Sequence, residues 1–399
     1  MAKQVQDAYI VAAKRTPVGK APRGMFRNVR PDDLLAHALR AALAQVPSLD
    51  PAAVDDVIVG CAIPEAEQGM NVARVGLLLA GLPDSVAGAT VNRFCASGLQ
   101  AVAFAADRVR LGEADVMIAG GTESMSMIPM GGNKISFNEH IFDRGENVAI
   151  GYGMGITAEK VAQQWKVSRE AQDRFATESH RKALAGIEKG EFADEIVPYE
   201  IDEKLPDLAS HEVRHEKRVA SVDEGPRPGT TPEVLAKLKP AFAAKGSVTA
   251  GNSSQTSDGA GAVIIVSEAA LKRFDLRPLA RMLGFAVAGV PPQIMGIGPK
   301  VAIPKVLKQV GLKQDDLDWI ELNEAFAAQS LAVIQDLGLD AAKVNPLGGA
   351  IALGHPLGAT GAIRTATVVH GLRRRGQKYG MVTMCVGTGM GAAGVFERL

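Results

Sequence analysis

The first third of the chain alternates short apolar runs with stretches in which apolar side chains recur at helical spacing. Residues 8–13 and 56–60 are typical of buried strands, whereas residues 32–45 and 71–80 are typical of amphipathic helices. A further strand is predicted at residues 116–119, leading into paired glycines. This alternation predicts an α/β fold with a mostly parallel sheet covered by helices.

The middle of the chain interrupts this rhythm. From residue 122 to residue 246, turns rich in Met and Gly surround one predicted amphipathic helix at 168–189, and a Pro-rich segment follows at 225–232. Residues 248–267 then become strand-like again, with a buried strand at 263–266. We therefore expect a separate lobe inserted into a sheet domain.

The second half of the chain resembles the first at three strand ends. The matching pairs are residues 56–59 with 318–321, 91–92 with 344–345, and 116–121 with 381–387. Two similar α/β halves that pack together bring their corresponding loops to one place. We therefore expect one pocket built from both halves.

Composition limits the compartment and the partners. The 399 residues, 47% hydrophobic and 22% charged, are typical of a globular protein of two or three domains. The 44 Lys and Arg balance 44 Asp and Glu, so no overall charge directs the chain to nucleic acid or to a membrane surface. Three cysteines form no disulfide framework, and the sequence shows neither an apolar leader nor a membrane span, which favours the cytoplasm.

Cys95 is the most informative residue of this pattern. It lies between a predicted strand ending at Val91 and a helical spacing that begins at Leu99, so Cys95 and Ser97 fall at or just before a helix N-terminus. Backbone N–H groups and the helix dipole there favour a thiolate, which predicts a lowered thiol pKa and a nucleophile. A buried small apolar residue is an equally good interpretation of this stretch alone, and we favour it for Cys61.

Three further segments supply partners for a cysteine nucleophile. His355 lies in a Gly- and Pro-rich loop before a predicted helix, where it can accept a proton from a nearby thiol or donate to an oxyanion. Asn323 and Glu324 follow a predicted strand, and a neutral Asn can orient a water or donate to a developing oxyanion. Cys385 ends another strand. Taken singly, such a histidine is more often structural, and such a cysteine more often belongs to the core.

Four segments together resemble the signature motifs of the thiolases, the acetyl-CoA C-acyltransferases. They are Asn-Arg-Phe-Cys-Ala-Ser-Gly around Cys95, Asn-Glu-Ala-Phe from Asn323, Gly-Gly-Ala-Ile-Ala-Leu-Gly-His-Pro-Leu-Gly-Ala-Thr-Gly around His355, and Cys-Val-Gly-Thr-Gly-Met-Gly from Cys385. The resemblance covers essentially the whole chain. It implies two similar α/β halves with mixed five-stranded sheets covered by helices, plus an inserted loop lobe. The implied domains are residues 1–121 with 247–270, the lobe 122–246, and residues 271–399.

The resemblance implies a role for each motif residue. Cys95 would carry the acyl group, His355 would deprotonate it, and Cys385 would move the proton on or off the α-carbon of the acetyl unit. One oxyanion hole would combine His355 with a water held by Asn323, and the other would use the backbone N–H groups of Cys95 and Gly387. The implied reaction cleaves a 3-oxoacyl-CoA with free CoA into acetyl-CoA and a shortened acyl-CoA, or runs in reverse. CoA and acyl-CoA are then substrates, and no metal or separate cofactor is expected.

Seven further residues match family positions that contact CoA or the acyl chain. The set is Ser254 for the pantetheine, Arg227 for the nucleotide, Met154 and Met295 for the acyl end, and Ala250, Ala325 and Phe326. The alternatives from sequence alone are a capping serine, a solvated arginine and methionines of an ordinary core.

Two segments distinguish among family members. Residues 151–155 read Gly-Tyr-Gly-Met-Gly, without the histidine that short-chain biosynthetic thiolases carry before the methionine, and residues 295–304 look more like degradative 3-ketoacyl-CoA thiolases. We therefore favour a broader acyl range over a short-chain acetoacetyl-CoA thiolase. Two other interpretations are a decarboxylating ketosynthase, which would lack Cys385 as acid and base, and a non-catalytic acyl-lipid carrier.

The resemblance also implies a dimer formed through the sheet edges of the first domain, an arrangement that hides edge N–H and C=O groups. Tetrameric relatives add a long loop from the inserted lobe. The corresponding residues 130–150 are mostly polar here, with few apolar anchors, which predicts a homodimer rather than a tetramer.

Overall fold

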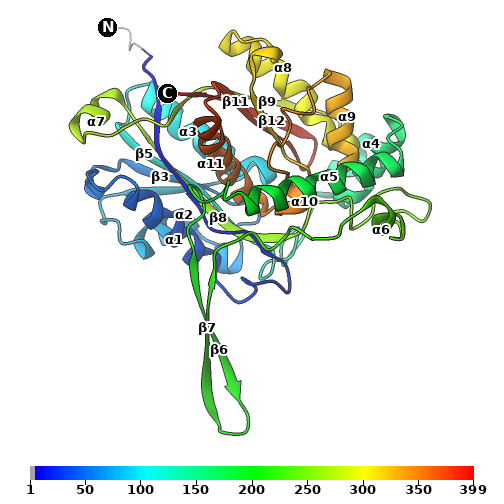
Figure 1. Cartoon of the computed structure of the whole chain (residues 1–399), viewed down its shortest axis with the longest axis horizontal. Coiled ribbons are helices and arrows are strands. Elements are labelled where there is room, and N and C mark those ends of the chain that lie inside the picture. Colours follow the sequence, from blue (N-terminus) through cyan, green and yellow to red (C-terminus); the bar gives the residue numbers. More distant parts are fainter. Residues whose placement is uncertain (1–4) are drawn as a thin grey trace.

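A computed structural model describes residues 5–399. Residues 1–4, on which the expected lack of a leader partly rests, lie outside the described residues. A ten-stranded sheet dominates the molecule, and a two-stranded ribbon projects from it (Figure 1). The strands of the large sheet are β1 (Tyr9–Arg15), β2 (Gly19–Lys20), β3 (Asp56–Gly60), β4 (Ala87–Val91), β5 (Val116–Ser124), β8 (Ser257–Val266), β9 (Ala280–Gly289), β10 (Trp319–Leu322), β11 (Tyr379–Val386) and β12 (Met390–Arg398). The ribbon is formed by β6 (Tyr199–Asp207) and β7 (Glu212–Ala220).

The large sheet consists of two halves with the same strand order. One half reads β4-β3-β5-β8-β1, and the other reads β10-β11-β12-β9 with Val344 bridged to Ile320 beyond β10. The halves join where β1 pairs with β9 through Tyr9 with Arg281 and Ile10 with Ala280. All three predicted repeats are confirmed, because β3, β4 and β5 occupy the places that β10, the segment at Val344 and β11 occupy in the second half.

The sheet is mixed, so the mostly parallel sheet predicted from the alternation of strands and helices is wrong. Parallel pairs join β3 to β4 and β5, and β10 to β11, whereas β8, β9 and β12 pair antiparallel with their neighbours. The reason is local. β8 enters the sheet after the inserted lobe, and β12 follows β11 through a tight turn, so neither strand is reached through a crossover helix.

Helices cover both faces of each half-sheet. They are α1 (Pro31–Ala44), α2 (Val72–Leu79), α3 (Ser97–Arg110), α4 (Met154–Gln164), α5 (Arg169–Glu188), α6 (Pro232–Ala236), α7 (Glu268–Arg273), α8 (Gly298–Val310), α9 (Ala327–Leu337), α10 (Ala350–Leu353) and α11 (Leu357–Arg375). Short 3-10 turns are η1 (Pro51–Ala53), η2 (Ala66–Gln68), η3 (Phe94–Ala96), η4 (Glu139–Asp143), η5 (Gly145–Gly151), η6 (Pro292–Ile297) and η7 (Gln314–Asp316). The predicted helices correspond to α1, α2 and α5, which confirms them.

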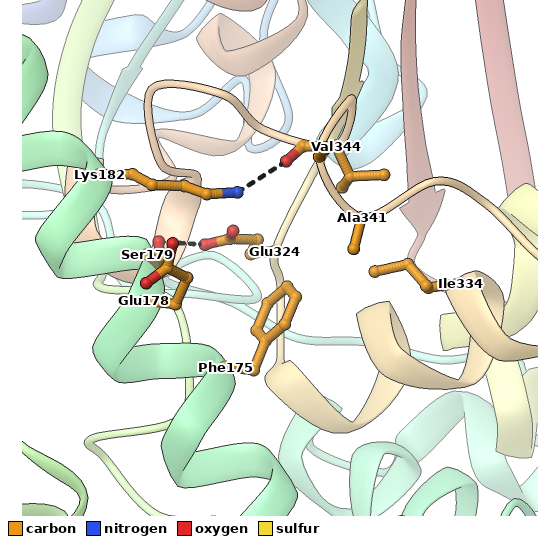
Figure 2. A pocket seen from close by; sticks show the side chains of 9 residues that line it. Phe175, Glu178, Ser179, Lys182, Glu324, Ile334, Ala341 and Val344 are labelled. Atoms are coloured by element: carbon orange, nitrogen blue, oxygen red, sulfur yellow. Dashed lines mark hydrogen bonds between the residues drawn. The ribbon is translucent and has the colours of Figure 1, made fainter.

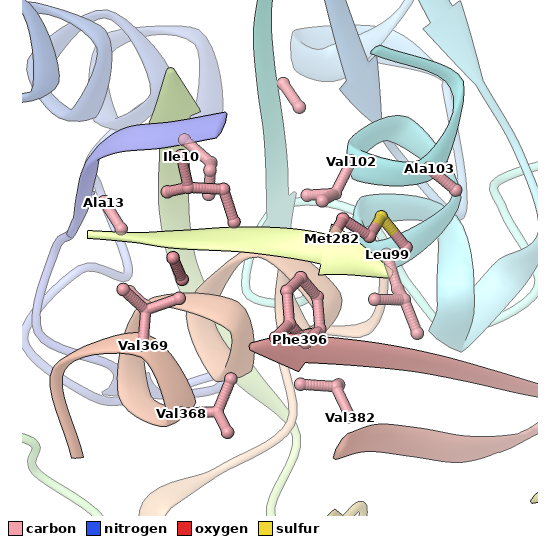
Figure 3. Packing of buried hydrophobic residues seen from close by; sticks show 14 of the residues in the cluster. Ile10, Ala13, Leu99, Val102, Ala103, Met282, Val368, Val369, Val382 and Phe396 are labelled. Atoms are coloured by element: carbon pink, nitrogen blue, oxygen red, sulfur yellow. The ribbon is translucent and has the colours of Figure 1, made fainter. Parts of the chain in front are cut away.

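The main core lies around α3 and α11, which pack against each other in the middle of the molecule. Figure 3 shows Ile10 of β1, Leu99 of α3, Met282 of β9, Val368 of α11 and Phe396 of β12 in one buried cluster. A second core lies under α1 and α2, and a third lies under α8. The central cluster therefore joins the two halves more extensively than the short β1–β9 pairing does.

The first turns of α3 and α11 approach so closely that only glycine fits at several positions. A Cβ at Gly361 would lie 2.0 Å from the backbone N of Leu99, and one at Gly98 would lie 2.7 Å from the carbonyl oxygen of Gly358. Contacts of this length do not occur between real Cβ atoms and backbone. These glycines therefore fix the spacing of the two helix N-termini.

The inserted segment holds two features that the sequence did not predict. The β6–β7 ribbon was missed because β7 is mostly charged and almost entirely exposed, and in β6 only Tyr199, Ile201 and Leu205 alternate with polar residues. The segment 130–150 exposes Ile135, Phe137, Phe142 and Val148, so the expectation that this loop has few apolar anchors is wrong. These four side chains are scattered along the segment in the sequence, and folding brings two of them together: the rings of Phe137 and Phe142 have centroids 5.8 Å apart.

Within residues 5–399, every helix is either too short or too polar to cross a lipid bilayer. That is all the structure says about a membrane.

We predict that Gly361→Ala destabilises the protein, because the new methyl group meets the backbone of α3 rather than a side chain that can rotate away. Overpacking at a rigid contact costs about 1–3 kcal/mol or more. Thermal denaturation should show a clearly lower midpoint than that of Gly145→Ala, whose Cβ meets no atom within 4 Å. Equal midpoints for the two variants would contradict the close approach.

Candidate active site

A strained turn presents Cys95 between β4 and α3. Phe94 has a φ of 43°, a left-handed conformation that is rare for a bulky residue, and η3 then leads into α3 at Ser97. The backbone N–H of Phe94 donates to Asn92 Oδ1 (2.7 Å), and Ser97 Oγ accepts from the N–H of Arg93 (2.9 Å) and donates to the carbonyl of Phe94 (2.6 Å). The prediction that Cys95 lies just before a helix N-terminus is confirmed.

The pKa of this thiol differs from the sequence-based expectation. Burial raises the pKa of Cys95 to about 11, although hydrogen bonds from the backbone N–H groups of Gly387 and of Cys95 itself act to lower it. The expected lowered pKa is therefore wrong, because desolvation of the sulfur outweighs the N–H groups. Burial also raises the pKa values of Cys61 and Cys385 above their usual range. The thiol of Cys95 is protonated at neutral pH and needs a base when it attacks.

His355 lies immediately before α11 and is held on both sides of its ring. Its Nδ1 lies 2.6 Å from Thr360 Oγ1, and its Nε2 lies 3.3 Å from Asn323 Nδ2. If Nδ1 carries the proton and donates it to Thr360, Nε2 keeps a lone pair and can accept a proton. Burial, helped by the nearby charge of Arg364, lowers the pKa of His355 to about 3, so the ring is neutral at physiological pH.

Cys385 ends β11 beside a tight turn. It is fully buried, and Gly387, Thr388 and Gly389 form the turn into β12, with φ values of 67° and 94° at the last two. Burial is the main cause of the raised pKa of Cys385, and interaction with Cys95 adds to it, which places the two thiols close together. The sulfur of Cys95 thus lies near both the N–H of Gly387 and the side chain of Cys385.

The three motifs meet because the elements that carry them pack together. The 3-10 turn η3 contacts both α11 and β11, so the loop of Cys95 lies against the start of the helix that follows His355 and against the strand of Cys385. Asn323 joins them through its contact with His355. The corresponding strand ends of the two halves therefore do come together, whereas one pocket built from both halves stays a prediction.

The residues predicted to contact substrate divide into two groups. Met154, Met295, Ala325 and Phe326 form one apolar cluster with Cys385, at the site.

Ser254 lies next to this cluster, because its N–H donates to the carbonyl of Ala325 (2.9 Å). Arg227 and Ala250 are exposed, and the N–H of Arg227 donates to His180 Nδ1 (3.1 Å). These contacts leave the CoA-binding roles of the seven residues as predictions.

Sequence reasoning missed Asn92 and Thr360, which hold the nucleophile turn and the His355 ring. Both lie inside the motifs quoted above, three residues before Cys95 and five after His355, and their polar side chains become informative only once the turn geometry is known. Glu123 was missed as well. The available signal was a carboxylate near the end of β5, a strand that is otherwise buried along its whole length.

A cavity of about 310 Å³ lies on the other side of the Asn323–Glu324 segment. Figure 2 shows it between α5 and α9, with Phe175, Ser179, Lys182 and Glu324 among its walls. Ser179 Oγ donates to Glu324 (2.6 Å), and Lys182 Nζ donates to the carbonyl of Val344 (3.1 Å). The cavity therefore adjoins the back of the site and does not include Cys95. In the described part of the chain, no three His, Cys, Asp or Glu side chains gather closely enough to hold a metal ion.

This arrangement is suited to covalent acyl transfer. A thiol lies beside backbone N–H donors and a second thiol, and a buried neutral imidazole stands at the contacting helix end. A thiol that attacks a carbonyl needs a base for its proton and donors for the developing oxyanion, and the site offers both.

Comparison with known proteins agrees with this chemistry. Residues 8–269 match the model for the thiolase N-terminal domain, and residues 276–398 match that for the thiolase C-terminal domain. A 3-ketoacyl-CoA thiolase of Bacillus subtilis (strain 168) is 50% identical over 394 residues, which cover 98% of this chain and 100% of the relative. Two solved structures are each 41% identical to this chain. Human mitochondrial 3-ketoacyl-CoA thiolase matches with a TM-score of 0.88, and the match covers 99% of each chain. The dimeric peroxisomal thiolase of Saccharomyces cerevisiae matches with a TM-score of 0.89, and the match covers 99% of this chain and 98% of that chain.

The matched models together span both halves of the sheet and the inserted segment, and these relatives are 41–50% identical over nearly all of this chain. The chain belongs to the thiolase family.

Proposed function

We propose that this enzyme is an acetyl-CoA C-acyltransferase that cleaves 3-oxoacyl-CoA with free CoA to give acetyl-CoA and a shortened acyl-CoA. The observation that carries the proposal is the packing of the Cys95 turn η3 against β11 and α11, which brings Cys95 near Gly387 and Cys385 and near the loop of His355. Two thiols with a buried neutral histidine supply a nucleophile and two proton carriers, which is what reversible cleavage of a carbon–carbon bond next to a thioester requires.

The first half of the reaction forms the acyl-enzyme. His355 takes the proton of Cys95 as the sulfur attacks the 3-oxo carbon of the substrate. The bond between the α- and β-carbons then breaks, and its electron pair passes to the acetyl-CoA enolate. Cys385 donates its proton to the α-carbon of that enolate, which releases acetyl-CoA and leaves the acyl group on Cys95 as a thioester.

The second half transfers the acyl group to CoA. The thiol of the incoming CoA loses its proton to the Cys385 thiolate and attacks the thioester carbon, and the Cys95 sulfur leaves and takes back the proton held by His355. Shortened acyl-CoA is released, and both thiols and the imidazole return to their starting states. Running the two halves backwards gives the Claisen condensation.

Two oxyanions develop along this path. We assign the oxygen of the tetrahedral adduct on Cys95 to the N–H groups of Cys95 and Gly387. We assign the enolate oxygen to His355 and a water held by Asn323, whose Oδ1 is buried and lacks a hydrogen-bond partner among residues 5–399. Donors placed in advance of the reaction stabilise such charges most effectively in a dry site.

Substrate recognition follows the family pattern in this proposal. Ser254 contacts the pantetheine and Arg227 the nucleotide, while Met154 and Met295 wall the acyl end. Gly153 is exposed, and a Cβ there would meet no atom within 4 Å, so the absence of a side chain before Met154 leaves this place open. This space and the names of the full-length relatives support a 3-ketoacyl-CoA thiolase over a short-chain acetoacetyl-CoA enzyme.

The remaining alternatives are less well supported. A decarboxylating ketosynthase has no use for a thiol at Cys385, and a non-catalytic acyl-lipid carrier has no use for the paired thiols and histidine. An assay of the acetoacetyl-CoA enolate absorbance separates all three, because only a thiolase makes its loss depend on added CoA.

The compartment and the assembly also belong to the proposal. We favour the cytoplasm, although one of the relatives named above is peroxisomal. We favour a homodimer, because β4 forms one end of the strand order and one of these relatives is dimeric. Exposed Val75, Leu78 and Leu79 beside β4 add apolar surface at that edge.

We predict that Cys95→Ala abolishes turnover and most labelling by iodoacetamide. The other two thiols are fully buried, and burial raises their pKa values further, so neither ionises as readily as Cys95. Turnover and the mass of the labelled protein measure the two effects. Equal labelling of wild type and variant would show that another cysteine is the reactive thiol.

We predict that Cys385→Ala loses cleavage and condensation by about 10²–10⁴-fold, because those steps move the α-proton, yet still accepts an acyl group from acyl-CoA on Cys95. In that acyl transfer Cys385 only exchanges a proton with the sulfur of CoA, and water can replace it there because a thiolate can leave without being protonated first. Mass spectrometry of the quenched protein measures the first activity, and the enolate assay measures the second. A parallel loss of both would contradict the separate roles of the two cysteines.

We predict that light scattering coupled to gel filtration at micromolar concentration gives about twice the 41.8 kDa chain mass. Because the loop at 130–150 exposes apolar side chains, a species of four chains is the main competing outcome. Replacement of Phe137 and Phe142 by serine would then convert four chains to two, whereas it leaves a dimer held at β4 unchanged.

A further inference from the structure

Glu123 lies near the end of β5, fully buried, and its carboxylate receives hydrogen bonds from three separate parts of the chain. Its Oε2 accepts from the N–H groups of Ala62 and Gly358, both at 2.8 Å. Its Oε1 accepts from the N–H of Ile63 (3.3 Å) and from the side-chain amide of Gln68. Every one of these partners is a donor, so an ionised carboxylate is the side chain that satisfies them all.

One arm of this network leads to the nucleophile. The loop at Ala62 and Ile63 is fixed by Glu123, and the carbonyl of Ala62 accepts from Asn92 Nδ2 (2.9 Å). Asn92 Oδ1 in turn accepts from the N–H of Phe94, the residue in the left-handed conformation directly before Cys95. The backbone of Ala62 and the side chain of Asn92 thus connect the carboxylate to the turn that carries Cys95.

The other arm leads to the histidine. Pro356 precedes α11 and has no side-chain acceptor, so Glu123 caps the helix from a neighbouring strand by accepting from the N–H of Gly358. Thr360 lies in the same helical turn and contacts His355 Nδ1 at 2.6 Å. A shift of this turn therefore moves the ring of the base.

Space at this junction allows no looser arrangement. A Cβ at Gly358 would lie 2.6 Å from the N of Ala62 and 2.8 Å from Glu123 Oε2, and one at Gly121 would lie 2.5 Å from the carbonyl oxygen of Gly358. The carboxylate is thus packed directly between the two loops, with glycine on either side.

We propose that Glu123 is a positioning residue that holds the Cys95 turn and the His355 turn at the separation needed for proton transfer. The proposal rests on the roles of Cys95 and His355 proposed above. Glu123 touches neither the substrate nor the reacting atoms in this scheme. It acts through Ala62 and Asn92 on one side and through Gly358 and Thr360 on the other.

The test is Glu123→Gln. The amide of Gln keeps one oxygen and replaces the other carboxylate oxygen with an NH2 group. Because each oxygen of Glu123 accepts from N–H donors, the NH2 group would then face donors and not acceptors. We expect acylation of Cys95 by acetyl-CoA, followed by rapid quench and intact mass, to slow by at least about tenfold, because small misplacements of reacting groups are costly. We expect the KM for acetyl-CoA to change by less than about twofold, since no substrate contact is lost.

Glu195→Gln is the matched control. Glu195 is also a fully buried carboxylate that contacts α11, through Thr367 (2.9 Å), but the contact lies three turns from His355. We expect its acylation rate to stay within about twofold of wild type. A rate for Glu123→Gln within threefold of wild type, or an equal loss in Glu195→Gln, would overturn the proposal.

A second set of variants tests the connection itself. If Glu123 acts on His355 through Thr360, Thr360→Val also slows acylation at an unchanged KM. The double variant Glu123→Gln with Thr360→Val is then no slower than the slower of the two single variants. Fully additive losses would contradict this route. If Glu123→Gln fails to fold, Asn92→Ala and Thr360→Val carry the test alone, and wild-type acylation rates in both would overturn the proposal.

The proposed function can fail separately. If wild-type protein gains no acyl mass on Cys95, the nucleophile assignment is wrong. If wild type is acylated there and Glu123→Gln is acylated equally fast, only the role of Glu123 is wrong.

Discussion

The structure depends on the close contact between the first turns of α3 and α11. Each helix directs its N–H groups and the positive end of its dipole toward the same small region. Two positive ends that converge repel each other unless negative charge lies between them. The carboxylate of Glu123 lies at the start of α11, where it accepts from the N–H of Gly358, and the oxyanion and the thiolate of the proposed reaction would add negative charge nearby. The geometry that makes the site reactive is therefore also the geometry that requires a buried anion for stability.

Burial sets the resting state of the reacting pair. The pKa of Cys95 is raised to about 11 and that of His355 is lowered to about 3, both chiefly by desolvation, so at rest the thiol and the imidazole are neutral. A preformed thiolate–imidazolium pair is thus disfavoured, and proton transfer accompanies attack. A neutral thiol is less prone to oxidation than a thiolate, which suits an enzyme that keeps its nucleophile partly exposed while it waits for substrate.

The sequence was sufficient for the strands and helices that follow simple periodicity. The strands β3 and β10 and the helices α1, α2 and α5 lie where apolar spacing placed them, and the three strand-end repeats identified the two halves. Strand direction was not accessible in the same way, because β8 and β12 join their neighbours without crossover helices. The β6–β7 ribbon was not accessible either, since apolar alternation is confined to three positions of β6 and its partner β7 is almost entirely exposed.

For the site, the motif residues were predictable and their electrostatics were not. The position of Cys95 before α3 follows from the pattern around it, but its raised pKa depends on packing by α11 and β11, which come from the far end of the chain. Thr360 and Asn92 acquire meaning only from the turns they hold. Family resemblance supplied the roles of Cys385 and Gly387, which no local pattern distinguishes from an ordinary strand end.

The strand β1 has a consequence for how the protein is made. Ile10 emerges from the ribosome among the first residues, yet its neighbours in the sheet are Ile265 of β8 and Ala280 of β9. The strand that joins the two halves is apolar, and it therefore stays unpaired in the nascent chain until about two thirds of the chain has been synthesised. Contacts of such long sequence separation slow folding and leave aggregation-prone segments exposed on the nascent chain. The seam between the halves is thus the point at which this fold depends most on protection during synthesis.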